Sequence, residues 1–296
     1  MRKEMMTTSQ RGLQEDSLPF RLYQKAKKFG GWDPREIDFT QDLKDWQFLT
    51  GDQQEEILRL VSQFQAGEEA VTLDLLPLIM VIAKEGRLEE EMYLTTFLFE
   101  EAKHTEFFRV FLNEIGQTDD LSRFHSETYR TIFYSILPEA MDKLKEDHSP
   151  QALAEASTVY NMFVEGVLAE TGYFSFYESL EKAKVMPGLM KGIGLLKKDE
   201  SRHIGYGTFL LQRLIAEHPP LFDLVRNKMN ELAPLAQKLT QEGIAGKTHS
   251  AFGNTLDETM AFSMKQLSVR MDILARAKGK NVSEIHRTSE SDVGVL

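Results

Sequence analysis

Four long segments of this 296-residue chain carry an apolar stripe at helical spacing, and acidic residues interrupt every stripe. The clearest stripe consists of Leu94, Phe97, Glu101, His104, Phe108 and Phe111, whose steps of three and four follow a 3.6-residue turn. A carboxylate that faces a core is costly unless another group pairs with it. Glu100 and Glu106 occupy solvent-facing positions beside the stripe, so we expect those two to be exposed and Glu101 and His104 to be buried.

The other three stripes are interrupted at Glu68, at Glu165, and at Glu200 together with His203. These positions form an internal repeat, in which a lone Glu is followed by Glu-x-x-His 33 residues later in one half (68 to 101) and 35 residues later in the other (165 to 200). The spacing within each Glu-x-x-His places both side chains on one helical face. Four carboxylates and two imidazoles suit a pair of Fe or Mn ions. This set is typical of ferritin-like dimetal carboxylate proteins.

Other interpretations of these residues remain open from the sequence. The polar side chains could satisfy one another in a metal-free core, or a stripe could be wrongly phased and its face solvated. Glu165 has the weakest context, because its stripe is rich in small residues and Glu170 lies close by. Asp199 directly precedes Glu200 and is either a carboxylate that orients a ligand histidine or a solvent-facing helix residue.

The chain shows no strand alternation and no hairpin signal, which predicts an all-α protein with a ferritin-like four-helix bundle core and additional helices. We expect long helices at about 51–85, 88–115, 152–180 and 189–218, and further helices at about 124–144, 221–243 and 254–278. Pro77 is expected to kink or locally unwind the first of them. Residues 1–50 are predicted to be an N-terminal extension that packs on the bundle, 51–280 the dimetal-binding domain, and 281–296 a polar, disordered tail.

Composition narrows the class of protein further. The net charge of −11 argues against a nucleic-acid groove, and the absence of cysteine excludes disulfides and thiolate metal sites. The polar N-terminus has no apolar signal-peptide region, and no run approaches the roughly 18 apolar residues of a membrane helix. These features predict a cytoplasmic protein without an integral membrane segment.

Three motifs carry a resemblance to a known family. Glu101-Ala102-Lys103-His104, Tyr160-Asn161-Met162-Phe163-Val164-Glu165-Gly166 and Asp199-Glu200-Ser201-Arg202-His203 resemble ribonucleotide reductase small subunits, and more closely their relatives, the small-subunit-like ligand-binding oxidases. The resemblance covers roughly residues 20–280. It implies a heterodinuclear Mn/Fe cofactor, or two Fe, that activates O2. It also implies the ligand assignment: Glu68, Glu101 and His104 for the first metal, Glu165, Glu200 and His203 for the second, with Glu101 as a bridge.

Two positions separate the subfamilies. Classical small subunits keep a radical-bearing Tyr four residues after the first ligand His, where this chain has Phe108. That Phe also occurs in small subunits that use a Mn/Fe cofactor, so it does not by itself exclude a reductase. In the ligand-binding oxidases, a Val and a Tyr at the positions of Val71 and Tyr160 become joined by an ether crosslink when the metals activate O2. Ordinary core roles for these two residues are the alternative.

The resemblance further implies a bound long-chain fatty acid, whose carboxylate bridges the metals, and a homodimer. Six apolar residues are candidates for the wall of the ligand pocket: Phe97, Phe108, Val164, Leu168, Phe174 and Phe176. The alternative is that these residues belong to the ordinary hydrophobic core. Trp32 and Asp199 resemble the electron-transfer Trp and Asp of reductase small subunits, with Asp199 hydrogen-bonded to a ligand His.

Two further functions are alternatives. The first is a radical-generating small subunit of ribonucleotide reductase, which would dock a large catalytic subunit through the acidic, apolar-ended segment 289–296. The second is iron storage or a metal-free helical scaffold.

Overall fold

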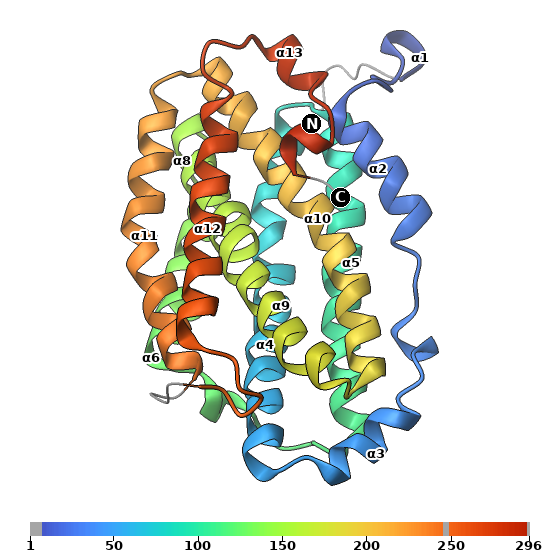
Figure 1. The fold of residues 1–296 in the computed structure, drawn as a ribbon. Coiled ribbons are helices and arrows are strands. Elements are labelled where there is room, and N and C mark those ends of the chain that lie inside the picture. The colour runs from blue at the N-terminus through green and yellow to red at the C-terminus, as the bar shows by residue number, and fades with distance from the viewer. Residues whose placement is uncertain (1–7, 245–248, 295–296) are drawn as a thin grey trace.

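The computed structural model describes residues 8–244 and 249–294, and helices make up most of these ranges, without a strand (Figure 1). Three helical segments and a fourth, composite one form the bundle core. They are α4 (Gly51–Lys84), α5 (Leu88–Glu114), α10 (Pro187–Glu217) and the run that begins at α8 (Pro150–Ser157). The other helices are α1 (Thr8–Arg11), α2 (Leu18–Phe29), α3 (Thr40–Phe48), α6 (Glu127–Thr131), α7 (Leu137–Asp142), α11 (Leu221–Gly243), α12 (Leu256–Ala275) and α13 (Val282–His286). The predicted all-α bundle with additional helices is confirmed.

Helix α4 begins where the sequence predicts. The Thr50 hydroxyl accepts a hydrogen bond from the Gln53 amide, and the Gln53 side chain accepts one from the Thr50 amide, which completes a capping box. The prediction that Pro77 locally unwinds this helix is wrong, because the helix continues through it to Lys84. The alternative, a kink at Pro77, stays a prediction. Leu75 and Leu78 on either side are fully buried, and their packing holds the backbone despite the missing amide donor.

The composite segment contains a long stretch of π-helix. Ser149 caps α8 by accepting from the Ala152 amide, and the backbone then forms a π-helix over Thr158–Ala169, continues as α9 (Glu170–Phe176), and forms a second π-helix over Tyr177–Glu181. A π-helix bonds each amide to the carbonyl five residues back, so it brings residues i and i+5 onto one side. Tyr160 and Glu165 stand in that relation. The helix expected at about 124–144 is also irregular, with α6, a π-turn over 132–136 and α7 in succession.

Both ends of the described chain pack on the bundle. Helix α2 lies against α5 (Figure 1). In the segment that follows α2, the Gly30 carbonyl accepts from Lys103 on α5 and the Trp32 ring donates to Asp199 on α10. The expectation of a disordered tail differs from the structure over residues 281–294, since α13 packs on α10 and the side chains of Ile285 and Val293 are fully buried. These two apolar residues anchor an otherwise polar segment. The predicted domain boundaries at residues 50 and 280 stay predictions.

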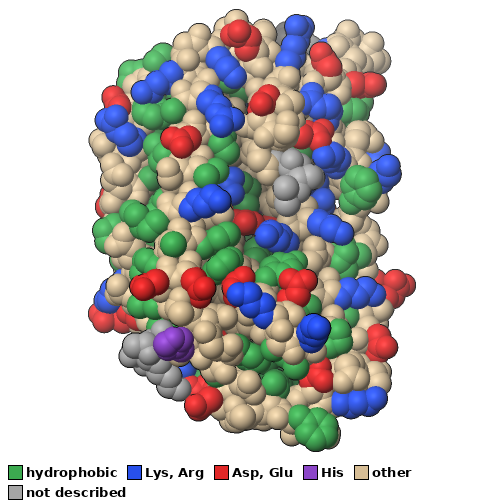
Figure 2. Space-filling view, in the orientation of Figure 1, with side chains coloured by type: hydrophobic (Ala, Val, Ile, Leu, Met, Phe, Trp, Pro, Cys, Tyr) green, Lys and Arg blue, Asp and Glu red, His purple; other side chains and the backbone are tan. Residues whose placement is uncertain are grey.

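The surface is charged and mixed. Acidic and basic side chains are interspersed over the face in Figure 2, so the net charge of −11 is not gathered into one acidic patch there. None of the helices in the described ranges has the length and apolarity that crossing a bilayer requires.

Candidate dimetal centre

All six carboxylate and imidazole residues singled out by the repeat meet at the centre of the bundle. Their ligand atoms form two groups, each within 4.8 Å: Glu68, Glu101, His104 and Glu200 in one, and Glu101, Glu165, Glu200 and His203 in the other. Every member is buried. Glu101 and Glu200 belong to both groups, so the two groups form one continuous site.

The atoms that face the centre lack hydrogen-bond partners among the described residues. They are both carboxylate oxygens of Glu101, Oε1 of Glu165, Oε2 of Glu200, and the Nδ1 atoms of His104 and His203. Polar atoms that are buried without a partner are rare in native proteins and call for an explanation such as an ion. Carboxylate oxygens and imidazole nitrogens that lie within 4.8 Å of one another in two groups fit a pair of transition-metal ions.

Each histidine is held by its second ring nitrogen. Nε2 of His104 lies 3.3 Å from Oδ2 of Asp199, and Nε2 of His203 lies 2.9 Å from Oε2 of Glu100. Carboxylates in this position fix the ring orientation and leave the other nitrogen free for a metal. The predicted contact of Asp199 with a ligand His is therefore present in the structure. The predicted exposure of Glu100 is wrong, because its side chain is buried opposite His203.

The two orienting carboxylates are crossed between helices. Glu100 lies on α5 and contacts His203 on α10, whereas Asp199 lies on α10 and contacts His104 on α5. Each directly precedes one of the shared ligands, Glu101 or Glu200. The repeat thus extends to acid-Glu-x-x-His, and that extended pattern is the signal from which Glu100 could have been found.

One arginine joins both carboxylates. The Nη2 atom of Arg202 lies 2.5 Å from Oε1 of Glu100 and 2.5 Å from Oδ1 of Asp199. Asp199 has two more donors, Lys103 Nζ and Trp32 Nε1, each 2.8 Å from Oδ2. Trp32 and Asp199, which the resemblance names together, therefore contact each other in the structure. Arg202 and Lys103 are not among the predicted site residues, because their role depends on contacts between helices that periodicity does not show.

The N-terminal segment completes this side of the site. The Gly30 carbonyl accepts a hydrogen bond from Lys103 Nζ, and a Cβ atom at Gly30 would lie 2.1 Å from Oε1 of Glu100. A side chain at position 30 would therefore displace the Glu100 carboxylate. The Trp32 ring stacks near His104, with ring centroids 6.3 Å apart.

Burial and mutual repulsion set the protonation of the cluster. Burial raises the pKa of Glu68 and of Glu165 well above the ordinary value, and the charges of neighbouring carboxylates raise both further. Burial alone would lower the pKa of His104, but the neighbouring carboxylates of Asp199, Glu200 and Glu68 raise it well above the usual range. Protons therefore balance the charge of the carboxylates in the metal-free protein, and bound cations would take their place.

Glu165 is fixed along its own helix. Nδ2 of Asn161 donates to Oε2 of Glu165 at 3.1 Å, and the Ser157 hydroxyl donates to Oδ1 of Asn161 at 2.9 Å. A Cβ atom at Gly207 would lie 2.1 Å from that of Asn161, so a glycine on α10 makes room for this chain. Oε1 of Glu165 is left free toward the centre of the site, which makes Glu165 the better candidate than Glu170.

Tyr160 and Val71 are neighbours across two helical segments. The Tyr160 hydroxyl donates to the backbone carbonyl of Val71 at 3.2 Å, and both side chains are buried. Phe108 is fully buried against Phe64 and Phe107, so the structure offers no hydroxyl at the position of the classical radical tyrosine.

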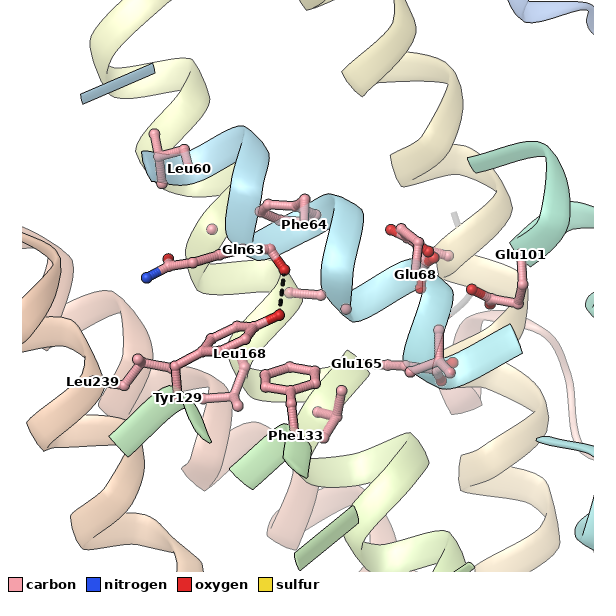
Figure 3. Close-up of a pocket in the computed structure, with 16 residues that line it drawn as sticks. Leu60, Gln63, Phe64, Glu68, Glu101, Tyr129, Phe133, Glu165, Leu168 and Leu239 are labelled. Atoms are coloured by element: carbon pink, nitrogen blue, oxygen red, sulfur yellow. Dashed lines mark hydrogen bonds between the residues drawn. The ribbon is translucent and has the colours of Figure 1, made fainter. Parts of the chain in front are cut away.

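A pocket leads outward from the centre, with Glu68, Glu101 and Glu165 at one end and Leu239 and Gln63 at the other (Figure 3). The volume of this cavity is about 90 Å³. Val164 and Leu168 line it as predicted. The remaining wall includes Leu60, Phe64, Gly67, Val71, Tyr129, Phe133, Ala169, Gly172 and Glu200.

Four predicted pocket residues lie elsewhere. The ring of Phe97 stacks on His203 with centroids 3.7 Å apart, and Phe174 stacks on Phe262 at the α9–α12 contact. Phe108 and Phe176 pack against Phe64 in the core, although Phe64 itself lines the pocket. The sequence shows that these residues are apolar and on a stripe, but not which side of the stripe faces the empty space.

Comparison with known proteins places this arrangement in a family. The family model "Ribonucleotide reductase, small chain" matches residues 20–262. Among solved structures, the R2-like ligand-binding oxidase from Sulfolobus acidocaldarius is 38% identical, with a TM-score of 0.87 over 95% of this chain and 98% of that chain. Point variants of an R2-like ligand-binding oxidase are 40% identical. One variant with an anaerobically reconstituted Mn/Fe cofactor has a TM-score of 0.86 and covers 92% of this chain and 98% of that chain. Another variant, reconstituted aerobically, has a TM-score of 0.82 and covers 88% of this chain and 98% of that chain.

The fold and the buried carboxylate–histidine site thus define a dimetal oxidoreductase of the ferritin-like class. Within that class, the chain belongs to the ribonucleotide reductase small-chain family and, inside it, to the R2-like ligand-binding oxidases.

Proposed function

We propose that this protein is an O2-activating oxidase with a Mn/Fe cofactor, or alternatively two Fe, that binds a long-chain fatty-acid-like ligand. Glu68, Glu101 and His104 would hold one metal, and Glu165, Glu200 and His203 the other. The observation that carries the proposal is the pair of buried ligand groups sharing Glu101 and Glu200, whose inward atoms have no other partner in the described structure. Bound in their reduced state, the metals supply electrons to O2 and the oxidising power for a strong C–H bond.

The surrounding residues orient the ligands and adjust their charge. Asp199 and Glu100 accept from Nε2–H of the two histidines, which leaves each Nδ1 directed to the centre as the atom that would bind a metal. Arg202 pairs with both carboxylates and Lys103 pairs with Asp199, so two cations offset the two negative charges that hold the histidines. Each of the six proposed ligands is at most 6% exposed, which limits the contact of bulk water with the reacting groups.

The contact between Tyr160 and Val71 supports an ether crosslink. The new bond joins the phenolic oxygen of Tyr160 to the Val71 side chain, and one hydrogen leaves each partner. The reaction is therefore a two-electron oxidation that releases two protons. Dioxygen would be the oxidant, and the bound metal pair would supply the other two electrons needed for its reduction to water.

The pocket supports the ligand class. Its inner end is formed by the carboxylates of the proposed metal site, where two cations would attract a ligand carboxylate. Its wall is mainly apolar, with Phe64, Val164 and Leu168 positioned to contact an alkyl chain. We expect extraction and mass spectrometry to find a bound long-chain carboxylic acid, and we expect Leu168→Trp to lose that ligand while it retains the metals.

The experiment that tests the function combines elemental analysis with peptide mass spectrometry. Anaerobic loading with Mn and Fe should give about two ions per chain, with anomalous scattering at both edges in crystals. Exposure to O2 should then yield a joined Val71–Tyr160 peptide that is lighter by two hydrogens than its two parts. Tyr160→Phe should bind the metals and give no joined peptide. Unlinked peptides alone in the oxidised wild-type protein would remove the crosslink, and absence of bound metal would remove the whole proposal.

The alternative function, a radical subunit of ribonucleotide reductase, has less support. Phe108 lacks the radical hydroxyl, and the described part of the candidate docking tail is folded, with Val293 fully buried. Nucleotide reduction with an added large subunit would overturn our preference.

We also propose that the protein is a homodimer. Leu73, Leu76 and Met80 form an exposed apolar stripe on α4, and Phe99 is exposed on α5, the helix that packs against α4. A second copy of the chain would cover this surface. Light scattering should show a dimer, and Leu73→Glu combined with Leu76→Glu should give a folded monomer. A cytoplasmic location stays a prediction.

A further inference from the structure

A row of aromatic rings leads from His203 between the N-terminal half of α5 and the C-terminal half of α10. The first ring is Phe97, which stacks on His203 at 3.7 Å between centroids. The next is Tyr93, one turn earlier on α5, at 6.0 Å from Phe97. Tyr206, one turn after His203 on α10, follows at 5.2 Å from Tyr93. All three rings are fully buried, so they form a closely packed path through the protein interior.

The path ends in a buried ion cluster. The Tyr206 hydroxyl donates to Oε2 of Glu90 at 3.1 Å. Nε of Arg213, which is fully buried, lies 3.3 Å from Oε1 of Glu90. Arg87 and Glu217, whose side chains are about a quarter exposed, continue the cluster to the surface through a contact of 2.9 Å. Charge and protons at Glu90 therefore have a polar connection to solvent.

The two tyrosines differ in one chemical respect. The Tyr93 hydroxyl has no hydrogen-bond partner in the described ranges, whereas the Tyr206 hydroxyl contacts a carboxylate. Oxidation of a phenol releases a proton as well as an electron, and a buried phenol needs an adjacent base to receive that proton. Burial raises the pKa of Glu90, which makes its carboxylate a stronger base than an exposed one. Tyr206 has such a base and Tyr93 does not.

We propose that Tyr206 is a redox-active tyrosine that passes an electron through the Tyr93 and Phe97 rings to the metal centre at His203, while its phenolic proton moves to Glu90. Tyr206 loses one electron and one proton and becomes a neutral phenoxyl radical. The oxidised metal pair gains the electron, and the Glu90 carboxylate gains the proton. A one-electron reductant in solution then supplies an electron and Glu90 returns the proton, which restores the phenol of Tyr206. This route rests on the proposed function. It reaches the metal site at His203, whereas Trp32, the residue that the family resemblance connects with electron transfer, lies near His104.

The test uses the full-length protein loaded with Fe alone, mixed with O2 and frozen during the reaction. Electron paramagnetic resonance should show an organic radical whose spectrum narrows when the tyrosine rings are deuterated. A nitroso spin trap followed by peptide mass spectrometry should place the adduct on Tyr206. Tyr206→Phe should lose both the signal and the adduct. Glu90→Gln keeps a hydrogen-bond acceptor but cannot take the proton, so its radical yield should fall.

Two controls separate the route from general damage. Tyr177→Phe removes a partly exposed tyrosine outside the row and should leave the signal unchanged. Tyr93→Phe keeps the ring and should keep the Tyr206 adduct. A signal that persists in Tyr206→Phe, or an adduct found on Tyr93 instead, overturns the inference. If Tyr206→Phe does not bind iron, the adduct position in wild type and the yield in Glu90→Gln decide it.

The same samples distinguish the two proposals. Iron content and O2 consumption are measured in each. Bound iron and O2 consumption without a radical on Tyr206 overturn the redox tyrosine alone. A protein that binds no iron overturns the proposed function and this inference together.

Discussion

The two histidines of the site are held by carboxylates in the same manner, but the two carboxylates have different surroundings. Asp199, opposite His104, has donors from Trp32, Lys103 and Arg202 in addition to the histidine. Among the described residues, Glu100, opposite His203, has hydrogen bonds with Arg202 and the histidine only.

The electrostatic consequence is visible at Asp199. Burial alone would raise its pKa, but the hydrogen bond with His104 and the charges of His104, Lys103 and Arg202 hold it far below the ordinary value. The His104 half is thus a dense ion cluster against the N-terminal segment. The His203 half is aromatic, with Phe97 stacked on the imidazole. The two repeated ligand sets therefore have different surroundings, which are polar around His104 and more aromatic around His203. The variants below test whether the two sides of the site respond differently.

The largest loss of bound metal is expected when a ligand shared by both groups is substituted. Glu101→Ala removes a carboxylate that belongs to both ligand groups, so we expect both metals to be lost. His104→Ala and His203→Ala each remove a ligand from one group only, and each should retain about one ion per chain. Elemental analysis after loading and desalting measures this. Retention of two ions in Glu101→Ala would show that the groups are independent.

Arg202→Met should have the largest effect on folding. It leaves two buried carboxylates, Glu100 and Asp199, without their common cation, and breaking a buried ion pair on one side costs about 3–5 kcal/mol. Urea unfolding of the metal-free protein measures the free energy. Arg226→Met, at a surface ion pair, is the matched control and should change it by less than about 1 kcal/mol. Equal effects of the two variants would contradict the central role of Arg202.

The carboxylates themselves can be compared by Asp199→Asn and Glu100→Gln. Loss of such a partner typically weakens metal binding about 10–100-fold, and we expect each variant to weaken the site of the histidine that it contacts. Asp199→Asn should be the more damaging of the two, because it also leaves Lys103 buried without its counterion. Competitive chelator titration monitored at each metal measures both. A larger loss of metal affinity in Glu100→Gln than in Asp199→Asn would contradict this ranking of the two carboxylates.

The smallest effects are expected at the rings. Trp32→Phe removes the hydrogen bond to Asp199 and should cost about 1–3 kcal/mol. Phe97→Leu removes the stacking on His203, which is worth about 0.5–1.5 kcal/mol beyond the lost apolar area. Thermal unfolding of the metal-free proteins measures both. An effect of Phe97→Leu on metal content larger than that of Glu100→Gln would show that the ring, not the carboxylate, orients His203.

The sequence predicted the parts of this site that depend on helical periodicity. Glu101 and His104 break an apolar stripe, and so do Glu200 and His203, and the structure buries all four. What the sequence could not supply depends on contacts between helices. Glu100 was expected in solvent because periodicity assigns it to a neighbouring face, but α10 covers that face with Arg202 and His203.

Backbone irregularity limited the prediction in a second way. A 3.6-residue period does not place Tyr160 and Glu165 on one side of a regular helix, and the π-helix over Thr158–Ala169 does. The pocket shows the same limit at the level of side chains. Val164 and Leu168 line it and Phe97 does not, although all three are apolar residues near the site.

The crossing of the orienting carboxylates has a consequence for how the site can assemble. Neither helical hairpin contains the carboxylate that aligns its own histidine, because Glu100 serves the opposite half and so does Asp199. A folding intermediate with only one hairpin in place would therefore present ligands with unrestrained imidazole rings. High-affinity metal capture should then appear late and in a single step, once both halves have docked.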